Sequence, residues 1–92
     1  TKVIDIIEEL KDFGVNVDVY DPWVDHAKES EWYKHGIIKN PIESDKKYDA
    51  IIVAVGHKEF KQYTNNNYIK LSNGQKVIID VKNIVKHPTW RL

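Results

Sequence analysis

Apolar residues recur every three or four positions between residues 2 and 13, which is the spacing of one face of a helix. The side chains on that face are Val3, Ile6, Ile7, Leu10 and Phe13. Gly14 follows, and glycine readily adopts the left-handed conformation that ends a helix. We therefore expect an amphipathic helix over residues 2–13, with Thr1 as its N-cap.

Two later segments have the pattern of strands. Residues 15–21 alternate between apolar and polar with a period of two, which indicates a strand with one less covered face, and Pro22 ends it. Ala50–Val55 is instead an unbroken run of six apolar residues. Such a run is typical of a strand that is buried on both faces of a parallel sheet. We expect this segment to be the central strand, with a second apolar strand over 76–80.

Shorter elements complete the pattern. Residues 25–35 favour a helix, with Trp23 facing the domain, and 37–39 form a short edge strand. Two short helical segments, 58–63 and 66–71, are expected after the central strand, and 84–92 looks like a tail in which Trp90 packs back. Helices that alternate with strands predict an α/β domain with a mainly parallel sheet of about four strands.

Composition narrows the function classes. The chain has 92 residues, 14 basic and 14 acidic side chains and no cysteine. The charge balance does not direct it to nucleic acid or to an anionic membrane, and thiol chemistry is excluded. The four histidines, at positions 26, 35, 57 and 87, lack the spacing of a zinc site. We expect a cytoplasmic location and, because the sequence starts at Thr1 directly before a helix, a fragment.

Polar residues follow three of the expected strands: Asp21, then Gly56 and His57, then the segment Asp80–Asn83. The carboxyl ends of parallel strands meet at one edge of a sheet, where α/β proteins bind ligands. For each of Asp21, Asp80 and His57 taken alone, capping of a turn or helix remains an equal alternative. The glycines stand apart at 14, 36, 56 and 74, so no glycine-rich phosphate loop is present. A role of Asp21 as the ribose-binding acid of a dinucleotide site is therefore not favoured.

Several segments together resemble a known family. They are Lys2–Leu10, Val17–Pro22, Tyr48–Phe60, Ile79–Asn83 and the ending Trp90–Leu92. In order and spacing they are similar to the carboxyl-terminal domain of the UDP-glucose/GDP-mannose dehydrogenase family. The segment around His57 and the ending are most similar to the UDP-N-acetylhexosamine 6-dehydrogenases of bacterial polysaccharide synthesis.

The resemblance implies a fold and an activity. The fold would be a Rossmann-like three-layer domain that lacks the family domain's first strand, with residues 1–92 forming a single truncated nucleotide-sugar-binding domain. The parent enzyme would use NAD to oxidise the C6 hydroxyl of a UDP-sugar to a carboxylate, and would be a homodimer. The family's catalytic cysteine, its lysine and its NAD site belong to other domains, so the fragment alone would be inactive and bind no cofactor.

The resemblance also implies site residues. The family carries a substrate-binding basic residue in an Asp-x-Lys/Arg segment after the last strand, which matches Lys82. Many relatives have glycine where this chain has Asn83, so either the backbone or the side chain of that residue could face the ligand. His57 matches a loop position at the same edge. The alternative is a free-standing Rossmann-like binding or interaction module without catalysis.

Loss of the family's first strand would leave a gap in the sheet, because that strand lies between the ones ending at Asp21 and Val55. Buried backbone groups without partners cost about 1–3 kcal/mol each, so an open gap is unfavourable. We expect direct parallel pairing of Val15–Tyr20 with Ala50–Val55, and hold association of two chains as the second possibility.

Overall fold

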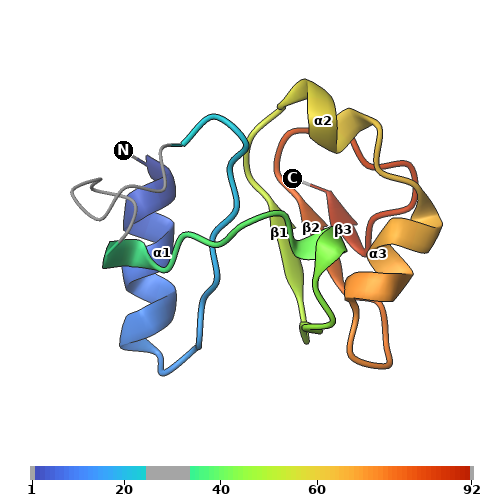
Figure 1. The fold of residues 1–92 in the computed structure, drawn as a ribbon. Helices are drawn as coiled ribbons and strands as arrows, with labels where there is room; N and C mark the ends of the chain where they lie inside the picture. Colours follow the sequence, from blue (N-terminus) through green and yellow to red (C-terminus); the bar gives the residue numbers. More distant parts are fainter. Residues whose placement is uncertain (1, 25–33, 92) are drawn as a thin grey trace. The chain divides into compact units, whose positions relative to one another are not determined.

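The structure, a computed structural model, describes residues 2–24 and 34–91. The chain divides into two compact units, Thr1–Pro41 and Ile42–Leu92, and each is described by itself (Figure 1). None of the helices in the described ranges is long and apolar enough to cross a membrane. The elements are α1 (Lys2–Asp12), the 3₁₀ helix η2 (Pro41–Glu43), β1 (Ile51–Val53), α2 (Lys58–Lys61), α3 (Asn65–Leu71), β2 (Ile78–Asp80) and β3 (Trp90–Arg91).

The first helix confirms the sequence prediction in extent but not in its buried face. Ile4 and Ile7 are the buried residues of α1, whereas Ile6 is 40% exposed and Phe13 is 78% exposed. The predicted face was therefore wrong by part of a turn, because the run from Val3 to Ile7 is apolar at nearly every position and leaves the facing side chains ambiguous. Gly14 has a positive φ of 83°, as expected for the residue that ends the helix.

The expected strand over 15–21 is reduced to one bridge. Val19 pairs in parallel with Ile37: its amide donates to the carbonyl of Gly36 at 2.9 Å, and its carbonyl accepts from Ile38 at 2.7 Å. Gly36 has a φ of 89°, and a Cβ there would lie 2.8 Å from the carbonyl oxygen of Val17. Glycine is therefore required for the two segments to approach.

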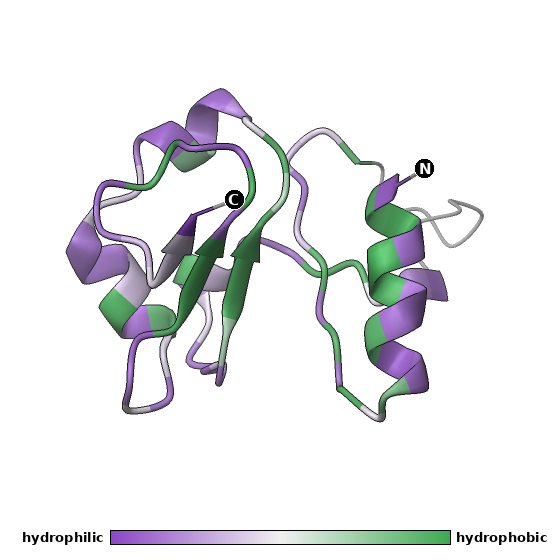
Figure 2. Cartoon of the chain, turned by 180° about the vertical axis from the view of Figure 1, so that it is seen from behind, coloured by the Kyte–Doolittle hydropathy of each residue, from purple (hydrophilic) through white to green (hydrophobic). Residues whose placement is uncertain are grey.

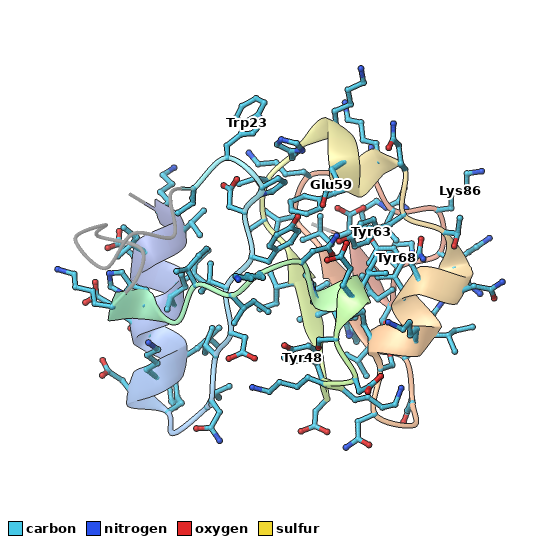
Figure 3. The ribbon with its side chains drawn as sticks, viewed as in Figure 1. Trp23, Tyr48, Glu59, Tyr63, Tyr68 and Lys86 are labelled. Carbon is cyan, nitrogen blue, oxygen red and sulfur yellow. The ribbon has the colours of Figure 1, made fainter. Side chains whose placement is uncertain are left out.

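Other expectations for the first unit have mixed outcomes. Trp23 is 84% exposed and does not face a core (Figure 3). The expected helix over 25–35 lies outside the described residues except for its last two, which have 3₁₀ conformation. Thr1, the expected N-cap, also lies outside them.

The second unit contains a three-stranded parallel sheet in the order β1-β2-β3. Ile51 to Val53 pair with Ile78 to Asp80, and β2 pairs onward with β3. The α/β class and the parallel sheet are thus confirmed, with three strands in the described ranges where about four were expected. The expected tail is wrong: Thr89 donates its amide to Ile78 and accepts that residue's amide on its hydroxyl, which draws the chain's end into the sheet.

The chain crosses from β1 to β2 through α2 and α3. In Figure 1, α2 lies above the strands, beyond the end of β1, and α3 lies beside them. Each helix begins within one residue of its predicted start.

The core of this unit is a cluster formed by Val53, Tyr68, Ile78 and Val85. In Figure 2 the strands β1 and β2 are largely hydrophobic in colour.

The strand that was expected to be central, β1, comes first in the order β1-β2-β3, so β2 is the middle strand and that expectation was wrong. β1 is also less covered than expected. Val53 is 7% exposed, but Ile52 is 39% exposed. Alternate residues of a strand point to opposite faces, so Val53 faces the core and Ile52 faces away from it. The expectation of burial on both faces of this strand was therefore wrong for Ile52.

The predicted pairing of Val15–Tyr20 with Ala50–Val55 is also wrong at Val19, whose backbone amide and carbonyl bond to Gly36 and Ile38. Val19 makes its parallel bridge with Ile37, and the strand neighbour of β1 is β2. A local partner, reached through a glycine that permits close approach, took the place of the distant one.

Candidate functional site

The register of the sheet brings the ends of its three strands to one level. Val53 at the end of β1 lies opposite Asp80 at the end of β2, and Asp80 lies opposite Arg91 of β3. We call the segments that follow, Ala54–His57 and Val81–Val85, together with Arg91, the strand-end rim. It contains the three predicted site residues, His57, Lys82 and Asn83.

Asp80 organises the loop from Val81 to Val85. Its side chain is fully buried, and its two oxygens accept hydrogen bonds from the backbone amides of Lys82 at 3.1 Å, Ile84 at 2.8 Å and Val85 at 2.8 Å. A second attachment joins this loop to β1, because the amide of Val81 donates to the carbonyl of Val53 at 3.0 Å. The loop is therefore held against the sheet by its own backbone.

These hydrogen bonds also set the charge of the carboxyl group. Burial by itself would raise the pKa of Asp80, but the amides of residues 82–85 point at the carboxylate and hold its pKa below the ordinary value. Asp80 is therefore ionised at neutral pH. Because the loop's amides face inward to Asp80, an anion outside the loop would have to be met by side chains.

Lys82 and Asn83 are exposed at the turn of this loop. Asn83 has a φ of 60°, the one positive value among the non-glycine residues of the described ranges. Asparagine and glycine are the residues that adopt this conformation most readily. The backbone conformation therefore accounts for asparagine or glycine at this position. Whether the backbone or the side chain of Asn83 faces a ligand stays a prediction.

Arg91 is a rim residue that the sequence analysis missed. Its Nη2 donates to the carbonyl oxygen of Val85, and its Nε lies 4.0 Å from Oδ2 of Asp80. The signal was weak: Thr89 and Trp90 favour strands, but a two-residue strand after Pro88 has no detectable period.

His57 has a local structural role. It is the N-cap of α2, and its Nδ1 accepts a hydrogen bond from the amide of Glu59 at 3.0 Å. Its ring lies 5.7 Å from that of Phe60, the first contact in a row of rings that continues through Tyr63 to Tyr68. The capping alternative is thus realised for His57, and a ligand contact by this residue stays a prediction.

The tyrosines of this row are packing residues. Tyr63 and Tyr68 lie 5.6 Å apart between ring centres (Figure 3). Burial, with a smaller contribution from Glu59, raises the pKa of Tyr63 to about 12, so its hydroxyl stays protonated at neutral pH. Neither ring supplies a base.

Asp21 lies in the first unit and closes a turn. Its carboxylate accepts the amide of Trp23 at 2.9 Å, and its carbonyl accepts the amide of Val24 at 3.2 Å. The turn-capping alternative is therefore realised for Asp21. Among the described residues, no three His, Cys, Asp or Glu side chains gather as a metal site.

A parallel α/β sheet with polar loops at its carboxyl edge defines a protein of the Rossmann-like class. Comparison with protein-family models then gives the family. Residues 1–87 match the model described as UDP-glucose/GDP-mannose dehydrogenase family, UDP binding domain, and the chain belongs to this family. The resemblance predicted from the sequence is confirmed.

Curated relatives agree with this assignment. The chain is 42% identical over 82 residues to the UDP-N-acetyl-D-glucosamine 6-dehydrogenase of Pseudomonas aeruginosa. This alignment covers 89% of this chain and 19% of that protein. The chain is 38% identical over 85 residues to the enzyme of the same name from Salmonella typhi, covering 92% and 20%. A UDP-N-acetyl-D-mannosamine dehydrogenase of Methanococcus vannielii is 32% identical over 88 residues, covering 94% and 19%.

The chain therefore spans about a fifth of the length of the curated relatives that it matches. The search of solved structures found no significant match.

Proposed function

We propose that this chain is the carboxyl-terminal, UDP-sugar-binding domain of an NAD-dependent UDP-sugar 6-dehydrogenase that makes polysaccharide precursors. The observation that carries the proposal is the match of residues 1–87 to the UDP binding domain of this family. The relatives' names add the substrate class, since they include 6-dehydrogenases of UDP-N-acetylated sugars. Their greater length supports a larger parent enzyme, in which further domains would complete the active site. The parent enzyme would be a homodimer.

In this proposal Lys82 is the substrate contact. Its side chain is exposed beside the end of β2, and an ammonium group binds phosphate as a point charge. The neighbouring amides serve Asp80, so a diphosphate would depend on this charge more than on the backbone. Asn83 would contribute through its backbone conformation, and His57 by shaping the start of α2. A single exposed lysine implies weak binding by the isolated chain.

The residues of this chain do not fit an NAD site. A dinucleotide turn needs several glycines in one loop at a helix start, but the chain's four glycines are separated by at least seventeen residues. Gly36 permits the close approach of its backbone to the carbonyl of Val17, and Gly14 ends α1. The cofactor of the parent enzyme would therefore be held elsewhere, and no step of hydride transfer is assigned to these residues.

A titration of the isotope-labelled chain with UDP tests the proposal. We expect amide NMR shifts that saturate at millimolar nucleotide and are centred on residues 81–85. Lys82→Ala should weaken binding roughly tenfold or more, because a charge-assisted contact is worth about 1.5–3 kcal/mol. Lys86→Ala removes a charge from the same segment and is the matched control, since its exposed side chain points away from the sheet (Figure 3). Equal effects of the two variants would remove Lys82 from the site.

Kinetics of the parent enzyme give a second test of the same contact. Lys82→Ala should raise the KM for the UDP-sugar or lower kcat/KM, and leave the KM for NAD nearly unchanged. The 92-residue chain itself should form no NADH with any UDP-sugar, because it has no cysteine to act as a nucleophile. Turnover by this chain alone would contradict the assignment of catalysis to other domains.

A further inference from the structure

The loop from Val81 to Val85 combines a fixed base with an exposed turn. Val85 belongs to the core and is 6% exposed, and Asp80 at the other end is fully buried. Between these two anchors, Lys82 and Asn83 are exposed. The direction of the Lys82 side chain therefore depends on how firmly the two anchors are held relative to each other.

Arg91 connects both anchors with one side chain. Its Nη2 donates to the carbonyl of Val85, the last residue of the loop. Its Nε lies 4.0 Å from Oδ2 of Asp80, the residue before the loop. A guanidinium can reach two acceptors at once because its donors form a rigid planar fork, whereas a lysine ammonium serves as a single point charge.

The hydrogen bond contributes more to this connection than the ion pair. At 4.0 Å the charges are at the outer limit of an ion pair, and the Arg91 side chain is 43% exposed, so solvent screens their attraction. The hydrogen bond to the carbonyl of Val85 holds the point at which the loop returns to the core, since Val85 belongs to the core cluster. Loss of the guanidinium would release this end of the loop without removing the inward bonds of Asp80.

We propose that Arg91 is a positioning residue of the nucleotide site, which ties the ends of the Asp80–Val85 loop together and thereby directs Lys82. This inference rests on the proposed function. It also goes beyond it, because Arg91 lies outside the residues 1–87 that the family model matches. The short strand β3 is the element that makes the connection, since its pairing with β2 places Arg91 opposite Asp80.

A double-mutant cycle on the whole chain separates positioning from direct contact. UDP affinity is measured by NMR titration for wild type, Arg91→Ala, Lys82→Ala and the double variant, with Lys86→Ala as the charge control. We expect Arg91→Ala to weaken UDP binding roughly threefold to tenfold, a coupling typical of residues in one hydrogen-bond network. In the Lys82→Ala background the same change should have no further effect, because Arg91 acts through Lys82.

Two more measurements make the test specific. Arg91→Lys keeps the charge but cannot serve both acceptors, so it should restore only part of the affinity, and it replaces Arg91→Ala if that variant does not fold. Amide hydrogen exchange of Lys82, Ile84 and Val85 without nucleotide should be faster in Arg91→Ala than in wild type or Lys86→Ala.

The outcomes are distinct. Wild-type affinity in Arg91→Ala would overturn the inference and leave the proposed function intact. If Arg91→Ala lowers UDP affinity equally in the wild-type and the Lys82→Ala backgrounds, Arg91 contacts the nucleotide directly. That result would overturn the positioning role. Absence of UDP binding by the wild-type chain would overturn the proposed function and this inference together.

Discussion

Asp80 is fully buried, whereas Lys82 and Asn83, two and three residues further on, are exposed. The carboxylate accepts hydrogen bonds from the amides of the following loop, so its negative charge fixes the conformation of that backbone. At the scale of single residues, the candidate site thus consists of one buried acid that organises the loop and one exposed base that is free to meet a ligand. Residues of opposite charge and close sequence position have different tasks because their burial differs.

Asn83 allows the backbone and side-chain roles to be separated. Its φ of 60° is costly for an ordinary residue, so Asn83→Ala should destabilise the chain by about 1 kcal/mol. Asn83→Gly should leave both stability and UDP affinity close to wild type, since glycine adopts this conformation freely. Urea unfolding and the UDP titration check the two variants. Loss of UDP affinity in the glycine variant, with stability retained, would assign the ligand contact to the Asn83 side chain.

At the scale of elements, the helices between β1 and β2 are too short to be stable by themselves. They have four and seven residues, well below the length at which isolated helices persist in water. Each instead begins with a side chain that accepts a backbone amide: His57 for α2, and Thr64 for α3. In α3 the Asn67 side chain accepts the amide of Thr64 in return, which completes a capping box.

The capping box should be measurable as stability. Thr64→Ala removes the acceptor for the Asn67 amide and should lower the free energy of unfolding by about 1 kcal/mol. Asn66→Ala is the matched control: it lies in the same exposed first turn, and its side chain should matter little. Urea unfolding of both variants tests this expectation, and equal stabilities would show that the box contributes nothing net.

At the scale of the whole molecule, the shifted pKa of Asp80 links folding to pH. The folded state holds this pKa below its ordinary value of 3.8. A carboxyl group of this kind stabilises the fold fully above its unfolded pKa, and the contribution is lost as the pH falls through the lower folded pKa. The stabilising effect of Asp80 should therefore be complete at neutral pH and fade below about pH 4.

Asp80→Asn isolates this effect. The side-chain amide that replaces the carboxylate has a nitrogen that cannot accept a hydrogen bond. One or more buried backbone amides of the loop therefore lose their acceptor, which costs about 1–3 kcal/mol at pH 7. The difference in unfolding free energy between wild type and the variant should shrink as the pH is lowered from 5 to about 2. Asp45→Asn, at an exposed position, serves as the control and should change stability by less than about 0.5 kcal/mol. A difference in unfolding free energy between wild type and Asp80→Asn that does not change with pH would contradict the ionised state of Asp80.

Local patterns were sufficient where a segment's structure depends on its own residues. The apolar period of α1, the strand run around Ile52 and the polar break before α3 each predicted an element that the structure contains. The family motif also marked Lys82, which lies at an exposed rim position. Patterns failed where several faces were equally apolar, as in α1, or where two residues were too few to show a period, as in β3.

The sequence by itself therefore determined the α/β class, the family and the position of the basic residue after β2, because these depend on residue types and spacing along the chain. Only the tertiary structure decided which partner each segment took. Val19 pairs with Ile37, and Arg91 lies opposite Asp80. Pairing between segments depends on backbone approach and register, which Gly36 and Thr89 permit through contacts that no periodic pattern contains.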